Sequence, residues 1–434
     1  MIGQLLLGLS VLVFIHELGH FLAAKAFKMR VDKFYIFFDF GKFKLFSFKR
    51  GDTEYGLGWF PLGGYVKIAG MIDESMDKEQ LKKDPEPWEF RSKPTWQRLI
   101  VMVAGVFMNL ILGIFIFSMI SFGYGDQKIP LDKNDPAIVA GEFGQKIGFM
   151  TGDTIIRINE LNFSDLDEFN DIYSLKILDN NSKILIQRQG KEVTIKTPSN
   201  FLDQFADEGK DDFIYPAYHF HVKNVIANSN ADAGGLQDND KIIAINGSRV
   251  DYYYDFVGRL KNEKQIDLTV LRNSDTLELP AIKVDEGKIG FYPEFDVYVE
   301  HLKYGFFKSF KIGNSKAWTL LEENTIGFIK LFSGDVDPRK AVKGPVGIAT
   351  IYGGEWIWLN FWMITGLLSL VLAFMNLLPI PALDGGHVIT IFIEMITGRP
   401  LRQKTMEIIQ TIGMIIVFGL IIFSIFNDII QNWF

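Results

Sequence analysis

Four stretches of the chain are apolar over the length that a membrane-spanning helix requires. A helix needs about 20 residues to cross a hydrocarbon core about 30 Å thick. The sequence therefore predicts four spans, at residues 1–24, 99–122, 356–378 and 405–428. The overall apolar content of 48% is ordinary for a soluble protein, so the membrane segments must be patchy. We expect a multi-pass α-helical membrane protein with a folded segment between the second and third spans.

Basic residues near the ends of these spans indicate which loops face the cytoplasm. They follow the first span, precede the second and lie between the third and the fourth, and none lies before the first or after the fourth. Because cytoplasmic loops are enriched in Lys and Arg, we expect residues 25–98 and 379–404 in the cytoplasm. Both termini and residues 123–355 would then face outward. The first stretch lacks the basic start and the cleavage site of a secretory signal, so we expect it to be retained.

The segment between the second and third spans contains an internal repeat. The motif D-x-I-I-x-I-N begins at Asp153 and again at Asp240, an offset of 87 residues. An Asn-Gly hairpin signal closes the second copy, whereas Glu160 replaces the glycine in the first. The pattern resembles a PDZ domain, and the spacing suits tandem PDZ-like domains at residues 123–212 and 213–299. Two generic small β-rich modules are the alternative, and whether either peptide groove is open stays undecided.

Residues 300–355 are periodic in apolar character and predict an amphipathic helix. Its prominent apolar residues include Phe306, Phe310, Trp318 and Phe332. Such a helix lies on the outer membrane surface or packs against the PDZ-like pair, and the sequence favours neither arrangement.

Composition narrows the possible chemistry. The chain has 434 residues, a net charge of −7 and no cysteine. The negative charge argues against a nucleic-acid-binding protein. Without cysteine there are no disulfides and no thiolate ligands, so a metal would be bound by His, Asp or Glu.

An H-E-x-x-H motif lies inside the first predicted span. His16 and His20 are four residues apart, so on a helix they share one face and can hold one zinc ion. Glu17 beside them can act as a general base on a water at the metal. His16 lies ~22 Å along the helix, within the cytoplasmic third of the bilayer. Three ionisable residues so close together in a span indicate a functional site.

A third ligand is predicted at the end of the third span. Catalytic zinc sites have three protein ligands and one open position. Asp384 is the only acid between Glu355 and Glu394. Pro379 and Pro381 break the helix before it, so the carboxylate can turn into the bundle. Taken alone, the sequence around Asp384 would indicate a Pro/Gly turn that ends the helix, with a solvated aspartate. Together with the H-E-x-x-H motif, it predicts a metal ligand.

These motifs together resemble the site-2 protease family of intramembrane zinc proteases. H-E-x-x-H in the first span is paired with N-x-x-P-x-P-x-L-D-G, which begins at Asn376. Tandem PDZ-like domains narrow the resemblance to the bacterial regulator-of-sigma-E type. Phe60 to Val66 is similar to that family's G-G-Y-V loop, a membrane re-entrant β-hairpin expected here near residues 41–70. Asn109 and the G-P-V-G segment from Gly344 match further family positions.

The resemblance implies roles for individual residues. His16, His20 and Asp384 would bind one Zn²⁺ per chain, with Glu17 as the catalytic base and acid. Asn376 would contact the substrate backbone, although an interhelical hydrogen bond is an equally good interpretation from the residues alone. Gly63, Gly64 and Tyr65 of the loop would bind substrate along a strand edge. For Tyr65 the alternative is anchoring at the membrane interface.

The resemblance also implies a function. We expect four spans, two extracytoplasmic PDZ-like α+β domains and a re-entrant β-hairpin in a bacterial cytoplasmic (inner) membrane. The substrates would be single-span membrane proteins, such as anti-sigma factors or remnant signal peptides, cleaved within the bilayer after another protease has trimmed their outer domains. The PDZ-like pair would exclude substrates with bulky outer domains, and no nucleic acid is expected as a partner.

Two other functions fit the sequence less well than proteolysis. A zinc transporter or sensor would need further acids or histidines along the spans, and Glu17 would have no role. An inactive scaffold working through its PDZ-like domains is disfavoured because the four motif residues are intact.

Overall fold

The protein forms two compact units. The computed structural model describes residues 1–39, 43–60, 63–71, 84–208, 212–353, 355–399 and 403–433. The first unit contains residues 1–125, 303–325 and 342–434, and the second contains residues 126–302 and 326–341.

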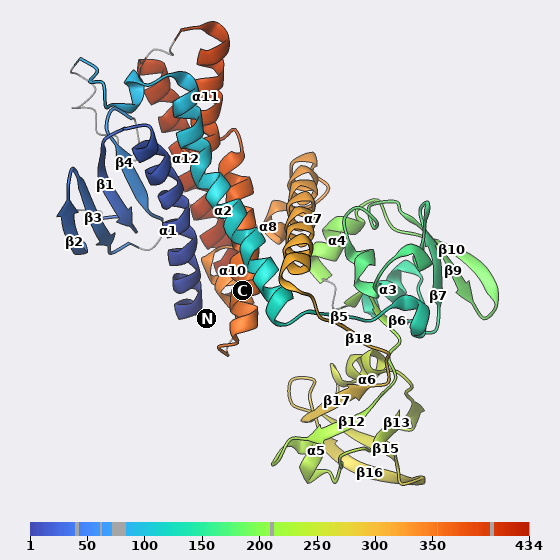
Figure 1. Ribbon diagram of the computed structural model, residues 1–434. Coiled ribbons are helices and arrows are strands. Elements are labelled where there is room, and N and C mark those ends of the chain that lie inside the picture. The colour runs from blue at the N-terminus through green and yellow to red at the C-terminus, as the bar shows by residue number, and fades with distance from the viewer. Residues whose placement is uncertain are drawn as a thin grey trace. The chain divides into compact units, whose positions relative to one another are not determined.

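Four helices among the described residues are long and apolar enough to span a membrane, as predicted (Figure 1). They are α1 (Ile2–Ala26), α2 (Thr95–Gly123), α10 (Trp358–Leu377) and α12 (Gln403–Trp433). The shortest has 20 residues, which at 1.5 Å per residue is just enough to cross the hydrocarbon core.

Small residues allow α1, α2 and α10 to approach closely. A Cβ at Gly19 of α1 would collide with the Ala104 carbonyl of α2, and one at Gly113 of α2 would come within 2.5 Å of Leu370 of α10. The Ser369 hydroxyl donates to the Asn109 carbonyl at 2.7 Å. Close backbone approach and interhelical hydrogen bonds are the usual means of helix association in lipid. The three helices therefore form a fixed frame for the side chains between them.

A four-stranded sheet follows the first span, where the sequence predicted a β-hairpin near residues 41–70. Its strands are β1 (Val31–Ile36), β2 (Lys44–Arg50), β3 (Thr53–Gly58) and β4 (Tyr65–Ile68), in the order β2-β3-β1-β4. β2 and β3 form a hairpin, but the sheet already begins at Val31, and β1 pairs parallel to β3. Burial of Phe34, Val66 and Ile68 in a common core with the end of α1 explains this extension. Pro61 and Leu62 of the predicted loop lie outside the described residues.

A helix occupies most of the segment that was predicted as a loop at residues 379–404. It is α11 (Asp384–Thr397), and Asp384 is its first residue. Its Ile391 is buried in the core shared by α1, α2 and the sheet. Gly398, with φ of +66°, ends the helix in the left-handed conformation typical of a C-terminal cap. The apolar run of α11 is too short for a span, and no other sequence pattern predicts a buried helix there.

The second unit contains two small α+β domains with the same topology. In the first domain, β6 to β10 are followed by β11, and in the second, β12 to β16 are followed by β17. Sheet orders β8-β7-β9-β10 and β14-β13-β15-β16 correspond strand for strand, and the pairs β6-β11 and β12-β17 correspond as well. The strands of the first domain are β6 (Ile138–Ala140), β7 (Thr154–Ile158), β8 (Leu161–Asn162), β9 (Lys183–Arg188), β10 (Lys191–Lys196) and β11 (Ile214–Pro216). Those of the second are β12 (Phe220–Val225), β13 (Lys241–Ile245), β14 (Ser248–Arg249), β15 (Gln265–Arg272), β16 (Asp275–Lys283) and β17 (Phe291–Phe295).

The helices of the two domains also correspond. In the first domain α3 (Glu142–Ile147) corresponds to α5 (Asn230–Ala233) of the second, and a 3₁₀ helix at Phe169–Tyr173 corresponds to α6 (Tyr253–Leu260). The first domain has an additional helix, α4 (Phe201–Glu208), with no counterpart among the described residues of the second. Each domain encloses its own apolar core.

The repeated aspartate has the same role in both domains. Asp153 is buried and accepts two hydrogen bonds at 2.7 Å from the Arg188 guanidinium. Asp240 accepts the equivalent pair from Arg272, at 2.7 and 2.6 Å. A bidentate arginine–carboxylate pair both satisfies the buried charge and fixes the sheet to the preceding turn. This shared ion pair explains the aspartate at the start of the repeat motif.

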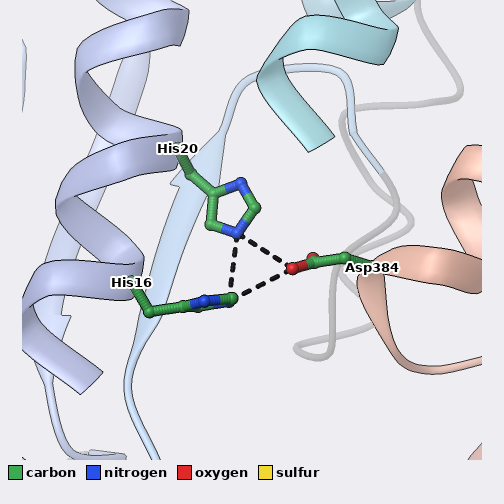
Figure 2. Close-up of side chains that lie close together, drawn as sticks. All are labelled: His16, His20 and Asp384. Carbon is green, nitrogen blue, oxygen red and sulfur yellow. Dashed lines mark hydrogen bonds and ion pairs between the residues drawn. The ribbon is translucent and has the colours of Figure 1, made fainter. Parts of the chain in front are cut away.

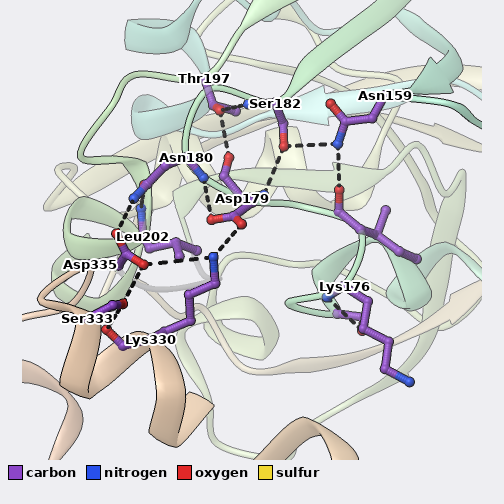
Figure 3. Close-up of polar contacts among 12 residues, drawn as sticks. Asn159, Lys176, Asp179, Asn180, Ser182, Thr197, Leu202, Lys330, Ser333 and Asp335 are labelled. Atoms are coloured by element: carbon purple, nitrogen blue, oxygen red, sulfur yellow. Dashed lines mark hydrogen bonds and ion pairs between the residues drawn. The ribbon is translucent and has the colours of Figure 1, made fainter. Parts of the chain in front are cut away.

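The segment after the two domains is divided between the units. Residues of α7 (Phe306–Ser333) up to Thr325 belong to the first unit, where Ala317 is buried with Phe117 and Leu370. Residues 326–341, with α8 (Pro338–Ala341), pack on the first α+β domain. Figure 3 shows Lys330 bound to Asp179 and the Asn180 amide near Asp335. The chain re-enters the first unit through α9 (Pro345–Ile351).

The connections into and out of the two domains are neighbouring strands. β5 (Asp126–Lys128) pairs antiparallel with β18 (Glu300–Leu302), with Gln127 opposite His301.

Candidate metal centre

Three side chains from two helices converge on one point in the first unit. His16 and His20 lie one turn apart on α1, and Asp384 is the first residue of α11 (Figure 2). The two histidine Nε2 atoms are 3.2 Å apart, and Asp384 Oδ2 lies 3.1 Å from that of His16 and 3.3 Å from that of His20. The structure thus brings together the three residues that the two motifs singled out.

These distances fit a tetrahedral zinc site. Ligand bonds of about 2.0–2.1 Å at the tetrahedral angle place neighbouring ligand atoms about 3.3 Å apart. All three distances lie within 0.2 Å of that spacing. The Asp384 Oδ2 atom is also buried without a hydrogen-bond donor among the described residues. A cation between these buried oxygen and nitrogen atoms would supply the partner that they lack, so the residues fit a metal ion.

The contact of His20 with α2 fixes its ring for metal binding. Its Nδ1 lies 2.8 Å from the Val101 carbonyl oxygen. A carbonyl only accepts, so Nδ1 carries the proton and donates, and Nε2 keeps its lone pair. Metal-binding histidines commonly donate their second N–H to a carbonyl or carboxylate in this way. The ring is therefore already in the tautomer that a metal requires.

Asn109 of α2 makes the corresponding contact with His16. Its amide nitrogen is placed 3.2 Å from His16 Nδ1, while its Oδ1 is buried without a partner among the described residues. The two ends of an amide are assigned by their hydrogen bonds. With Oδ1 turned toward His16, the ring Nδ1–H gains an acceptor and Oδ1 gains its missing donor. His16 then also presents a free Nε2 lone pair to the metal.

Gly105 provides the space that both rings occupy. A Cβ at this position would collide with His20 Nε2 and approach His16 Cε1 to 2.8 Å. Val101, Gly105 and Asn109 form one stripe along α2 at a spacing of four residues, and all three face the metal ligands. The sequence had singled out only Asn109 of this stripe. Val101 takes part through its backbone carbonyl and Gly105 through its missing side chain, so no side-chain pattern on this apolar helix could have revealed them.

Glu17 lines the same cavity as the three ligands. The cavity has a volume of ≈ 70 Å³ and is also lined by Gly64, Tyr65 and His387. About 10–15 Å³ suffices for one water, so there is room for several. A Cβ at Gly64 would lie 2.6 Å from Val13 and 3.4 Å from Glu17 Cγ, so glycine keeps this wall open. A carboxylate, water and the metal ligands can therefore meet in one buried space.

The predicted substrate-binding residues are divided between the cavity and its surroundings. Asn376 of α10 places its amide nitrogen 3.4 Å from His16 Nε2, beside the metal ligands, and is not among the side chains that line the cavity. Gly64 and Tyr65 line the cavity. Gly63, with φ of +149°, packs against the Phe38 ring instead.

The Tyr65 hydroxyl belongs to a polar cluster at the sheet. It donates to Asp39 at 2.8 Å, and Lys33 contacts both residues. Partial burial opposes ionisation of Asp39, but the hydrogen bonds from Lys33 and Tyr65 outweigh it, so the pKa of Asp39 lies below its usual value. Its charge thus holds Tyr65 at the end of β4. No sequence pattern indicated this cluster or His387 and Gln410, which also line the cavity.

Comparison with known proteins agrees with this site. Residues 4–420 match the sequence model of Peptidase family M50. The chain is 28% identical over 454 aligned positions to the regulator of sigma E protease of Haemophilus influenzae, covering 99% of this chain and 98% of that protein. It is 28% identical over 453 positions to the regulator of sigma-E protease RseP of Escherichia coli, covering 98% of each. With a family match over nearly its whole length and a His-His-Asp cluster at a membrane helix, the chain belongs to peptidase family M50, as an intramembrane zinc metalloprotease of the regulator-of-sigma-E type.

Proposed function

We propose that the protein cleaves single-span membrane proteins within the bilayer, with one zinc ion held by His16, His20 and Asp384. The observation that carries this proposal is the convergence of three ligand atoms at tetrahedral spacing beside a cavity that also contains Glu17. Zinc in such a site supplies Lewis acidity that activates water and polarises the scissile carbonyl.

Glu17 is the proton carrier of the proposed reaction. Its carboxylate takes a proton from the attacking water and returns it to the nitrogen of the leaving amine. The Asn376 amide lies next to His16, where it can donate a hydrogen bond to the carbonyl oxygen of the cleaved bond as negative charge develops there. Glu17 and Asn376 both lie beside the metal ligands, so these roles need only small proton movements.

An unwound substrate segment is proposed to lie along β4. A helix conceals its peptide bonds, so the segment at the metal must be extended before cleavage. β4 is at the edge of its sheet, with β1 as its one neighbour among the described strands, and its residues Tyr65 and Val66 line the cavity. Pairing with a free strand edge holds an extended peptide through backbone hydrogen bonds. Gly64, directly before β4, leaves room for that segment to come close to Glu17, and Gly63 precedes it in the same loop.

The relatives support the proposed substrate class, and the charge pattern supports the proposed orientation. Two relatives are named as regulators of sigma E, and anti-sigma factors or signal-peptide remnants are the proposed substrates, cut after their outer domains are trimmed. The basic residues between the spans favour residues 25–98 and 379–404 in the cytoplasm and the two α+β domains outside a bacterial inner membrane.

The decisive experiment compares two variants that leave side-chain shape almost unchanged. Glu17→Gln should retain zinc and lose cleavage of a single-span substrate by at least about 10²-fold, because it removes only the base. Asp384→Asn should lose zinc and cleavage together, because it removes the anionic ligand. Zinc content and cleavage would be measured on the same purified samples in lipid vesicles. Near-normal cleavage by Glu17→Gln would refute the proposal, and zinc flux across the vesicles without cleavage would favour a transporter.

A further inference from the structure

The fourth span is buried at only a few positions near its two ends. Of the α12 residues whose burial is described, four are buried: Gln410, Gly413, Asn427 and Asp428. Three of these four are polar, although polar residues in a span are costly unless they find partners. The contacts of each polar residue therefore show what that end of the helix does.

At one end of α12, the buried polar groups are fully used within the protein. Asp428 accepts hydrogen bonds from the backbone N–H groups of Gly344 and Val346, each at 2.8 Å, and from that of Gly347 at 3.1 Å. Asn427 donates to the Val342 carbonyl at 2.8 Å. These contacts join α12 to the start of α9 and account for both residues structurally.

At the other end, Gln410 has no such partner among the described residues. Its side chain is 6% exposed, and its amide forms no hydrogen bond with any other described residue. Gly413, one turn further along, packs directly against the Pro381 carbonyl, so α12 passes beside the turn that carries Asp384. Gln410 thereby reaches the cavity that contains His16, Glu17 and Asp384. The polar atoms of its amide are not among the fully buried atoms that lack a hydrogen bond, so they open onto this cavity and can bind a group placed there.

We propose that the Gln410 amide binds one peptide unit of the unwound substrate segment in the cavity. A glutamine amide offers one carbonyl and one NH₂ group, which match the N–H and C=O of a peptide unit. The segment paired with β4 exposes its second row of backbone groups, and these need partners at this depth in the bilayer. The inference rests on the proposed function and adds a substrate-binding residue from the fourth span.

This role makes recognition independent of side-chain identity. Gln410 would bind backbone groups that every substrate shares. It lies on α12, the helix of the four spans whose described central residues are not buried. Water is the alternative occupant, because the cavity has room for it.

The test replaces single peptide bonds of the substrate by esters. An ester removes the N–H donor and weakens the carbonyl acceptor at one position without changing the side chains. A synthetic single-span substrate would carry one ester at each position flanking the cleaved bond in turn, and wild type would be compared with Gln410→Leu in vesicles. Gln4→Leu is the matched control, because Gln4 is also buried in a span but does not line the cavity. Its amide donates a hydrogen bond of 3.0 Å to the Glu355 carbonyl.

We expect one ester position to raise the KM of wild type and of Gln4→Leu about 3- to 10-fold, the value of one hydrogen bond. Gln410→Leu should show that higher KM already with the all-amide substrate, a similar kcat, normal zinc content and no further loss with the ester. If the ester substrates raise the KM of Gln410→Leu at the same position and as much as that of wild type, the inference is wrong and Gln410 binds only water. Loss of zinc from Gln410→Leu would also contradict the inference. Failure of the proposed function is distinguishable, because wild type and Glu17→Gln would then cleave the all-amide substrate equally.

Discussion

The second hydrogen bond of each histidine decides whether the metal site is ready to bind. His20 donates to a backbone carbonyl, which no substitution of a side chain can remove, whereas His16 depends on the Asn109 side chain. The two ligands therefore differ in how far they can be disturbed by mutation. Asn109 is fully buried in α2, and Ser369 holds its backbone in place.

Asn109→Leu should weaken zinc binding by about 10- to 100-fold, the usual cost of losing such an orienting partner. The leucine keeps the volume and removes the acceptor for His16 Nδ1–H. Asn109→Asp keeps an acceptor at the same place and should retain zinc. Zinc affinity would be measured by competition with a chelator, with folding followed by circular dichroism. Equal loss in both variants would show that Asn109 only fills space.

Single residues differ in how well the sequence revealed them. His16, Glu17 and His20 carry a motif whose spacing has a direct geometric meaning, and Asp384 was isolated as the one acid in an apolar region. Gly105 and Gln410 lie alone on apolar helices, where a glycine or an amide has many structural explanations. Their importance depends on which helix face meets α1 or the cavity, and only tertiary packing determines that.

At the scale of elements, α11 is the part of the site that the sequence did not predict. The four spans and the repeated strands have strong periodic patterns, whereas α11 is short and follows two prolines. It becomes a helix because its apolar face is buried with α1, α2 and the sheet. The pairing of β1 with β3 was hidden for a similar reason, because parallel strands are joined by distant contacts that no local pattern encodes.

Arg98 and Glu394 form the ion pair that ties α11 to α2, and both side chains are largely buried. Arg98→Met leaves the Glu394 charge without its partner, which typically costs 3–5 kcal/mol for a buried pair. Because Asp384 begins α11, we expect faster zinc loss and a lower melting temperature although no ligand is changed. The exchanged pair Arg98→Glu with Glu394→Arg should recover part of both. Zinc release unaffected by Arg98→Met would mean that the turn before Asp384 fixes the ligand without help from α11.

At the scale of the whole molecule, the orientation in the membrane is a prediction that labelling can test. The native chain has no cysteine, so an introduced thiol is the only one present. Lys191 in the first α+β domain and Ser92 before α2 are both exposed. In intact cells, Lys191→Cys should react with a membrane-impermeant thiol reagent, and Ser92→Cys should react only after lysis. The reverse pattern would place the metal site near the opposite face of the bilayer.

The last prediction concerns the two α+β domains as a substrate filter. All proposed ligands and the base belong to the first unit, so removing the domains should relax substrate choice and leave the chemistry intact. β5 and β18 are paired neighbours, so residues 129–299 can be replaced by a two-residue Asn-Gly turn without separating the ends. The deletion removes Asp179, which pairs with Lys330, and Asp203, which pairs with Lys340, and residues 326–341 lose the domain on which they pack.

One substrate would be compared with and without its folded outer domain, in full-length and shortened enzyme of equal zinc content. If the domains act as a filter, the ratio of cleavage of the trimmed to the untrimmed substrate should be smaller for the shortened enzyme than for the full-length enzyme. The double variant Lys330→Gln and Lys340→Gln in the full-length chain controls for the lost contacts, and its preference should stay that of wild type. An unchanged preference after deletion would assign selection to the spans. If a folded, zinc-loaded shortened enzyme cut neither form, the domains would recruit substrates and not exclude them.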